Sequence, residues 1–254
     1  EVSQLHGDVA QNQFPDFMID YITNGVYHPH WVGDSFSSLF DDRLSGWRTE
    51  PDLLKNLDNI TDEEIQSAHE NQKKILIDYA NIHAEKKLSS DMLTIGFARR
   101  AAEYKRANLV FSDIDRLLEM GRGKVQFIFS GKAHPKDAGG KDLIREVIQN
   151  ANKLSNSINI VFLENYNMRL GRLITSGVDL WLNTPIRPME ASGTSGMKAT
   201  LNGVPNFSIL DGWWAEGCVH GKNGWAIGSA NLGDDDSDAN SLYEILKNDI
   251  IYSL

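Results

Sequence analysis

A lysine follows a turn rich in glycine and hydroxyl side chains at residues 190–198, which read Glu-Ala-Ser-Gly-Thr-Ser-Gly-Met-Lys. Gly193 and Gly196 flank a Thr-Ser pair, which permits a tight turn and close approach of the backbone to a ligand. Lys198 lies four residues after Thr194, about one helical turn or ~6 Å of rise. An anion held at the turn would leave the rest of its molecule beside Lys198, where an amine can form an imine with an aldehyde. An ordinary glycine-rich connection with a surface lysine explains the pattern equally well.

Four cationic side chains gather within eight residues: Arg99, Arg100, Lys105 and Arg106. They follow an apolar run typical of a strand, and we interpret the segment as the opening of a helix. A helix amino end offers free N–H groups and a positive dipole end, and the arginine fork matches phosphate oxygens. The alternative is an exposed cationic helix face. We favour an anion site because such faces do not usually begin at a strand end.

The elements that would position these residues alternate along the chain from about residue 92. Runs that are apolar throughout predict strands at 92–97, 125–129, 158–163, 178–183, 206–210 and 225–227. Helical patterns lie between them at 104–120, 141–154 and 168–176, and a short helix follows residue 193 and ends near Asn202 and Gly203. Apolar strands separated by helices indicate a parallel sheet covered on both faces. The predicted fold is therefore a doubly wound α/β domain, with ligands at the carboxyl ends of the strands.

The remaining segments carry fewer signals. Residues 1–60 are rich in turn signals, and Thr61 with Glu64 forms a capping-box pattern before a long helix predicted at 65–87. We interpret the acidic run 234–238 as a solvated loop. A calcium loop is excluded because Ala239 stands at the sixth position, where an EF-hand needs glycine. Asp211 follows a predicted strand, where a function and a simple turn explain it equally well.

Composition narrows the classes of function. The net charge of −10 argues against nucleic acid or an anionic membrane as the main partner. No apolar run reaches the roughly 18 residues of a membrane-spanning helix. Cys218 is the single cysteine, so no intrachain disulfide forms, which fits a reducing compartment and predicts a cytoplasmic location. We predict no metal site, because His28 and His30 lack carboxylate or thiol neighbours.

The lysine motif at 190–198, followed by Leu-Asn-Gly at 201–203, resembles the pyridoxal-phosphate lysine motif of the α-glucan phosphorylases that act on glycogen, starch or maltodextrin. Three further stretches agree in the same order: 99–106, 131–135 and 162–166. Residues 211–217 resemble the short bacterial and archaeal branch of the family. The resemblance covers nearly the whole chain, including 23–26. It implies the C-terminal half of a two-domain GT-B architecture built from Rossmann-like domains.

The resemblance also implies roles for individual residues. Lys198 would form the Schiff base with pyridoxal 5′-phosphate, and Tyr166 would line the cofactor pocket. The residues expected to hold the 5′-phosphate are Arg99, Gly193, Thr194 and Gly196. Arg100 and Lys105 would bind inorganic phosphate or the phosphate of glucose 1-phosphate, and Glu190 and Gly193 would contact sugar hydroxyls. The chain departs from many relatives at Arg99, where they have lysine, and at Ala102, where they have histidine.

The activity that the resemblance implies is phosphorolysis of α-1,4-glucan to glucose 1-phosphate with retention of configuration. The cofactor phosphate would act as acid and base, with Arg100, Lys105 and Lys198 as the catalytic residues. Residues 1–30 are expected to be the tail of a first domain and the interdomain segment. Residues 31–254 would form the second, cofactor-binding domain, ending before the family's last helices. We therefore expect little activity from this chain alone. A homo-oligomer is compatible with the sequence, which does not reveal the oligomeric state.

Two other functions compete with this interpretation. Retaining glucosyltransferases of the glycogen- and starch-synthase type share the architecture, but they place a glutamate where this chain has Lys198. A catalytically inactive carbohydrate- or phosphate-binding module would use Trp213, Trp214 or Trp225 to stack on sugars, although buried packing is the more usual role of adjacent tryptophans.

Overall fold

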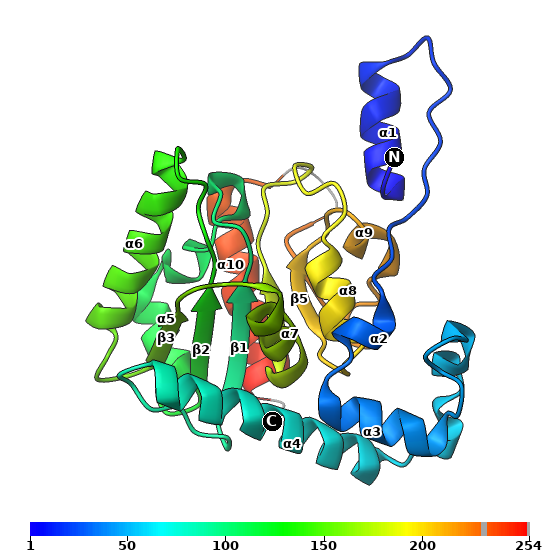
Figure 1. Cartoon of the computed structure of the whole chain (residues 1–254). Helices are drawn as coiled ribbons and strands as arrows, with labels where there is room; N and C mark the ends of the chain where they lie inside the picture. Colours follow the sequence, from blue (N-terminus) through cyan, green and yellow to red (C-terminus); the bar gives the residue numbers. More distant parts are fainter. Residues whose placement is uncertain (230–232, 253–254) are drawn as a thin grey trace.

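Six parallel strands form the centre of the molecule, in the order β3-β2-β1-β4-β5-β6 (Figure 1). This computed structural model describes residues 1–229 and 233–252. The strands are β1 (Leu93–Ala98), β2 (Val125–Ser130), β3 (Asn159–Leu163), β4 (Leu180–Asn183), β5 (Asn206–Ile209) and β6 (Gly224–Ile227). All six predicted strands are confirmed. The strand order reverses between β1 and β4. These two strands pair with each other in parallel, with Ile95 of β1 opposite Leu180 of β4. Ligands bind at such a switch point in doubly wound sheets.

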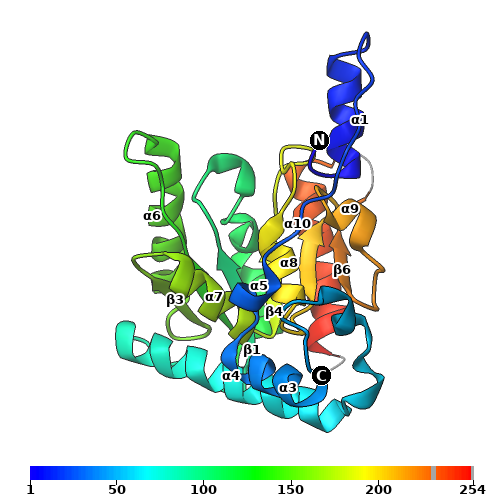
Figure 2. The ribbon, with the colours of Figure 1, turned by 45° about the vertical axis from the view of Figure 1, so that its right-hand side comes forward.

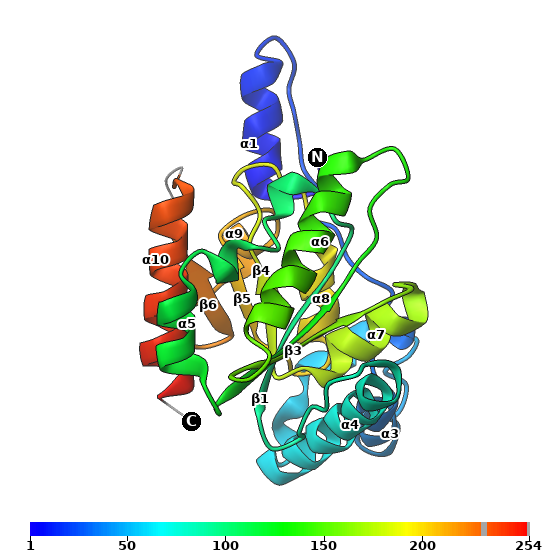
Figure 3. The same cartoon turned by 90° about the vertical axis from the view of Figure 1, so that its left-hand side faces the viewer.

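Helices cover both faces of the sheet, as Figure 3 shows from the β3 edge. Against one face pack α4 (Asp62–His83), α7 (Met168–Gly177) and α8 (Thr194–Thr200), and their buried residues share a core with Ile128 and Trp181 of the strands. Against the other face pack α5 (Ile114–Gly121), α6 (Ala138–Lys153), α10 (Asp235–Ile245) and the π-helix η5 (Leu246–Ile251), around Phe127 and Phe207. The predicted doubly wound α/β fold is confirmed.

The helix predicted at 104–120 is wrong. The structure has two 3₁₀ turns, η3 (Glu103–Lys105) and η4 (Leu109–Phe111), and only then α5. Arg106 ends η3 in the left-handed region, with a φ of 42°, and a regular helix cannot pass through that conformation. The helix starts afresh at Asp113, whose side chain accepts a hydrogen bond from the Arg116 N–H. The cationic segment therefore does not open a helix, and no helix dipole supports the anion site predicted there.

The first sixty residues contain more helix than their turn signals predict. They form α1 (Gln4–Gln13), α2 (His28–Trp31), α3 (Asp34–Arg43) and the 3₁₀ turns η1 (Pro51–Lys55) and η2 (Leu57–Asn59). The capping box of Thr61 and Glu64 is confirmed at the start of α4. That helix ends four residues earlier than predicted, because the Asn81 side chain binds the backbone N–H and C=O of Leu88 and turns the chain back.

The N-terminal arm, residues 1–24, projects beyond the sheet domain in both Figure 1 and Figure 2, while its two ends contact that domain. It consists of α1 and the segment that returns beside it, joined where the Ile19 N–H donates to the side chain of Gln11 at 3.0 Å. Several large apolar side chains of the arm are exposed, among them Phe17 and Ile22. Within the described ranges, none of the helices is long and apolar enough to cross a lipid bilayer.

Candidate active site

Loops that follow β1, β3 and β4 enclose a cleft of about 520 Å³ at the carboxyl edge of the sheet. Parallel strands end at one edge, so residues distant in sequence meet there. Seven of the predicted site residues line the cleft: Arg99, Arg100, Lys105, Tyr166, Glu190, Gly193 and Thr194. Gly196 and Lys198 lie further along α8 and do not line it.

A buried ion triad forms one wall of the cleft. One carboxylate oxygen of Glu190, Oε2, lies 2.9 Å from Nη2 of Arg99 and 2.6 Å from Nζ of Lys105. All three side chains are buried. Burial alone would raise the pKa of the Glu190 carboxyl, but the charges of Arg99 and Lys105 and their hydrogen bonds outweigh it and lower the pKa. Glu190 is therefore ionised at neutral pH and holds the two cations at the cleft.

Asp211, which follows β5, fixes the backbone that carries Glu190. Its carboxylate accepts hydrogen bonds from the N–H of Glu190 at 2.9 Å and from the N–H of Gly212 at 2.8 Å. The side chain is buried, and burial is the main cause of a raised pKa of its carboxyl. The sequence left a turn and a functional role open for Asp211. The structure shows that it closes the turn and orients the loop of Glu190.

Two buried polar atoms of the cleft residues have no hydrogen-bond partner among the described residues. They are Nε of Arg99 and Oγ of Ser195. The Arg99 guanidinium otherwise binds Glu190 and, through Nη1, the side-chain oxygen of Asn183. Buried donors without partners are costly. A cationic wall with free donors suits an anionic group, such as a phosphate, in this cleft.

Arg100 and Tyr166 complete the lining on the β1 and β3 sides. The Arg100 side chain is exposed, and no ion pair of it occurs within the described residues. The Tyr166 hydroxyl donates to the carbonyl of Ala98 at 3.3 Å. Burial raises the pKa of the Tyr166 phenol against the opposing charge of Arg99. Arg100 is thus a cation of this cleft that is available to a ligand.

Glycine is required at the turn before the lysine. Gly193 adopts a φ of 80°, in the left-handed region, and α8 begins directly after it. A Cβ atom on Gly196 would lie 2.3 Å from Oδ1 of Asn206, whose amide nitrogen donates to the Gly196 carbonyl. The short helix predicted after residue 193 is confirmed, and Gly196 lets it lie close against β5.

The amine of Lys198 lies over an aromatic ring and not in bulk solvent. Its Nζ is 3.6 Å from the centroid of the Trp31 ring, at the end of α2. The lysine is half-buried, and burial lowers the pKa of its amine. A lowered pKa increases the fraction of neutral, nucleophilic amine at pH 7.

Asn202 and Trp31 are functional candidates that the sequence analysis did not identify as such. The amide nitrogen of Asn202 donates to the carbonyls of Trp31 at 3.0 Å and of Lys198 at 2.8 Å, while its oxygen accepts from the N–H of Gly33 at 2.6 Å. This single side chain joins α2 to α8 and so sets the ring beside the amine. Asn202 belongs to the quoted lysine motif, whereas no local pattern links Trp31 to it.

The N-terminal arm also reaches the cleft. The Ser3 hydroxyl donates to the carbonyl of Ala191 at 2.7 Å, and the Asn24 amide donates to the hydroxyl of Ser192 at 3.0 Å. Asn24 lines the cleft beside them. The arm therefore supports the loop that carries Glu190, a contact that no sequence signal in residues 1–24 indicated.

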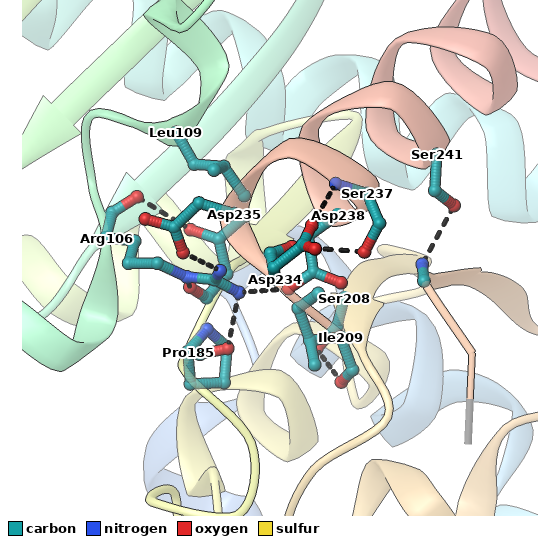
Figure 4. Close-up of polar contacts among 12 residues, drawn as sticks. Arg106, Leu109, Pro185, Ser208, Ile209, Asp234, Asp235, Ser237, Asp238 and Ser241 are labelled. Atoms are coloured by element: carbon teal, nitrogen blue, oxygen red, sulfur yellow. Dashed lines mark hydrogen bonds and ion pairs between the residues drawn. The ribbon is translucent and has the colours of Figure 1, made fainter. Parts of the chain in front are cut away.

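Arg106, the fourth cation of the segment, does not line the cleft, and Figure 4 shows its side chain beside Asp235 and Asp238. Its guanidinium lies 2.7 Å from carboxylate oxygens of both Asp235 and Asp238 at the start of α10. The solvated loop predicted at 234–238 is therefore wrong. Asp234 caps α10 by accepting from the Ser237 N–H, and Asp238 is buried.

Other candidates have local partners. His28 Nε2 hydrogen-bonds the carbonyl of Trp47 at 2.8 Å. No cluster of three metal-ligating side chains occurs within residues 1–229 and 233–252. Trp214 is buried with 2% of its surface exposed, so it cannot stack on a sugar. Burial raises the pKa of the Cys218 thiol, which disfavours a reactive thiolate.

Comparisons with known proteins agree with this geometry. The model of the family described as carbohydrate phosphorylase matches residues 2–217. Glycogen phosphorylase of Aquifex aeolicus is 40% identical over 98% of this chain, which covers 41% of that relative. Maltodextrin phosphorylase of Thermococcus litoralis is 38% identical over 98% of the chain and 34% of the relative. Glycogen phosphorylase of Mycobacterium tuberculosis is 36% identical over 96% of this chain and 32% of the relative. The chain thus spans only 32–41% of the length of these relatives.

Proposed function

The chain belongs to the carbohydrate phosphorylase family, and from this premise we propose that it forms the cofactor-binding part of an α-glucan phosphorylase. The proposed reaction is phosphorolysis of α-1,4-glucan by inorganic phosphate to glucose 1-phosphate, with retention of configuration. Relatives named glycogen and maltodextrin phosphorylase support this substrate class. The synthase-type alternative loses support, because the matched family is that of the phosphorylases and the discriminating position is Lys198.

The proposal depends above all on the environment of Lys198. Its amine is half-buried over Trp31 with a lowered pKa, one helical turn beyond the Gly193–196 turn. Such an amine fits the aldehyde of pyridoxal 5′-phosphate, which Lys198 would hold through Nζ. When bound, this group supplies an ionisable phosphate that can act as acid and base near neutral pH.

The cations of the cleft suit two phosphate groups with different partners. Arg99, with its unpartnered Nε, would hold the cofactor phosphate together with the turn residues Gly193, Thr194 and Gly196. Tyr166 would line the cofactor pocket. Arg100, exposed in the cleft, and Lys105 would bind the inorganic phosphate and neutralise its charge. Two phosphates near each other repel unless cations screen them, so a cluster of this kind is required.

Glu190 would serve the sugar. Because the pKa of its carboxyl is held low by Arg99 and Lys105, Glu190 is ionised and cannot act as the general acid of a hydrolytic glycosidase. An ionised carboxylate accepts hydrogen bonds, so we propose that Glu190, with the backbone at Gly193, contacts sugar hydroxyls.

At the level of domains, we propose that residues 1–30 lead in from a first domain and that 31–254 belong to the second. The remaining sugar contacts would come from the first domain, since this chain spans only 32–41% of the three relatives. We accordingly expect the isolated chain to release almost no glucose 1-phosphate from maltooligosaccharides in the presence of phosphate. Robust release would contradict the proposed division of the site.

The single Cys218 supports the cytoplasmic location that we propose.

The assignment of Lys198 is tested by trapping the cofactor. The chain is incubated with pyridoxal 5′-phosphate, reduced with borohydride, digested, and mapped by mass spectrometry. We expect the label on Lys198, its loss in Lys198→Ala, and its retention in Lys222→Ala, which removes an exposed lysine. A label spread over surface lysines, or one that persists in Lys198→Ala, would contradict the proposed function.

A further inference from the structure

Arg106 is a permanently charged side chain buried away from the cleft. Only 6% of its surface is exposed. Its Nη2 lies 2.7 Å from Oδ2 of Asp238, a buried carboxylate of α10, and Nη1 lies 2.7 Å from Oδ1 of the exposed Asp235. The same guanidinium donates to the carbonyls of Thr184 at 3.0 Å and Pro185 at 2.8 Å (Figure 4). Four oxygen atoms from α10 and the loop after β4 thus fix its position.

The residue before Arg106 is the cleft cation Lys105. The Thr184 hydroxyl oxygen lies 3.2 Å from the Lys105 carbonyl and 3.0 Å from the Arg106 carbonyl, so its single proton is shared between these two acceptors. Arg106 has a φ of 42°, a left-handed conformation that costs an arginine conformational energy. Such a conformation persists only where the surrounding contacts hold it. The guanidinium contacts and the Thr184 hydroxyl therefore fix the backbone from which Lys105 extends to Glu190.

We propose that Asp238 is a positioning residue for Lys105. By binding Arg106 it fixes the left-handed turn, and the turn presents the Lys105 amine to the cleft. Buried ion pairs contribute little net stability compared with apolar packing, so attachment of α10 alone would not require one. Asp235 contributes less than Asp238, because its carboxylate is exposed to solvent. That the position of the Lys105 amine serves phosphate binding rests on the proposed function. That Asp238 fixes this position through Arg106 does not.

The reactivity of lysine amines in the complete chain tests this proposal without cofactor or substrate. Lys73 is a matched internal control, because it is also buried and its Nζ lies 2.7 Å from a carboxylate oxygen of Asp179. Trace acetylation followed by peptide mass spectrometry gives a rate for each amine. In Asp238→Asn we expect acetylation of Lys105 to become roughly tenfold faster than in the unaltered chain, with the rate at Lys73 unchanged. Asp238→Glu, which keeps the charge, should restore most of the protection.

The control variant is Asp236→Asn, which removes an exposed carboxylate from the same helical turn. It should leave both rates unchanged. Equal rates at Lys105 in Asp238→Asn and in the unaltered chain would overturn the proposal, as would an equal acceleration in Asp236→Asn.

A second variant covers the case in which Asp238→Asn unfolds and exposes Lys73 as well. Thr184→Val removes the hydroxyl that holds the Lys105 carbonyl and leaves all charges in place. It should accelerate acetylation of Lys105 selectively, and failure to do so would then overturn the proposal.

Added inorganic phosphate tests the proposed function separately. If phosphate does not slow acetylation of Lys105, the anion role of that lysine fails, while a selective effect of Asp238→Asn still supports the positioning role.

Discussion

Glu190 competes with any anion for the two buried cations of the cleft. Replacing it by glutamine removes the charge that Arg99 and Lys105 now neutralise. We expect Glu190→Gln to bind inorganic phosphate more tightly, roughly tenfold, as measured by titration calorimetry. The matched control is Glu103→Gln, an exposed glutamate two residues from Lys105, which should change the affinity little. Weaker phosphate binding in Glu190→Gln would contradict this expectation. It would show that the carboxylate helps phosphate more, by positioning Arg99 and Lys105, than it hinders phosphate by competing for them.

Single residues of the candidate site can be named from the sequence where they belong to a short local motif. Arg99, Arg100, Lys105 and Glu190 were identified in this way, and the structure places all four in one cleft. What the sequence could not give is how they are partnered. The same segment sends Lys105 to Glu190 and Arg106 to Asp238, 132 positions further along the chain. Contacts over such separations are set by the fold, and no local spacing encodes them.

Among the secondary-structure elements, α4 is attached to the sheet through Asp179. Its carboxylate hydrogen-bonds His69 at 2.8 Å, lies 2.7 Å from Nζ of Lys73, and accepts from the N–H of Thr94 in β1 at 2.7 Å. Burial alone would raise the pKa of Asp179, but the His69 hydrogen bond and the Lys73 charge outweigh it and lower the pKa. This element contact therefore depends on pH.

We expect Asp179→Asn to lower the free energy of unfolding by about 3 kcal/mol at pH 7, because it leaves Lys73 buried without a counter-charge. The folded pKa lies below the unfolded value of about 3.9, so the carboxylate stabilises fully above that value. Its contribution is lost as the pH falls through the folded pKa. Urea unfolding across this range should show the difference between variant and unaltered chain shrinking toward low pH. Asp78→Asn, an exposed change on α4, should show no such difference.

The elements themselves were predictable to different degrees. The strands are mostly apolar and largely buried, with only isolated polar residues such as Gln126 and Ser208, and a parallel strand buried on both faces produces that pattern by itself. The helix predicted at 104–120 failed because Arg106 adopts a left-handed backbone while its guanidinium binds α10. Helical spacing in that segment reflects burial of apolar side chains such as Leu109 and Leu117 rather than a continuous helix.

For the molecule as a whole, the N-terminal arm is a segment in which several large apolar side chains are exposed. Phe17 and Ile22 are 66% and 81% exposed, and Phe14, Met18 and Tyr21 are exposed beside them in the arm. Exposed apolar side chains gathered in one segment favour association. We expect the isolated chain to self-associate with rising concentration in light scattering, and the double variant Phe17→Ser, Ile22→Ser to do so less. Ile82→Ser, which removes an exposed isoleucine of α4, should have no effect. Association undiminished in the double variant would exclude the arm as its cause.

Asn202 has a consequence for how the protein ages. Its neighbour is Gly203, and an asparagine followed by glycine loses ammonia spontaneously where the backbone is free to cyclise. Here the amide is fully buried and hydrogen-bonded at both of its ends. Were it hydrolysed to a carboxylate, two donors would become acceptors facing the carbonyls of Trp31 and Lys198, and the resulting repulsion would separate the indole from the amine. The long-term integrity of the Lys198 environment therefore depends on the backbone at Asn202 and Gly203 staying too rigid to cyclise.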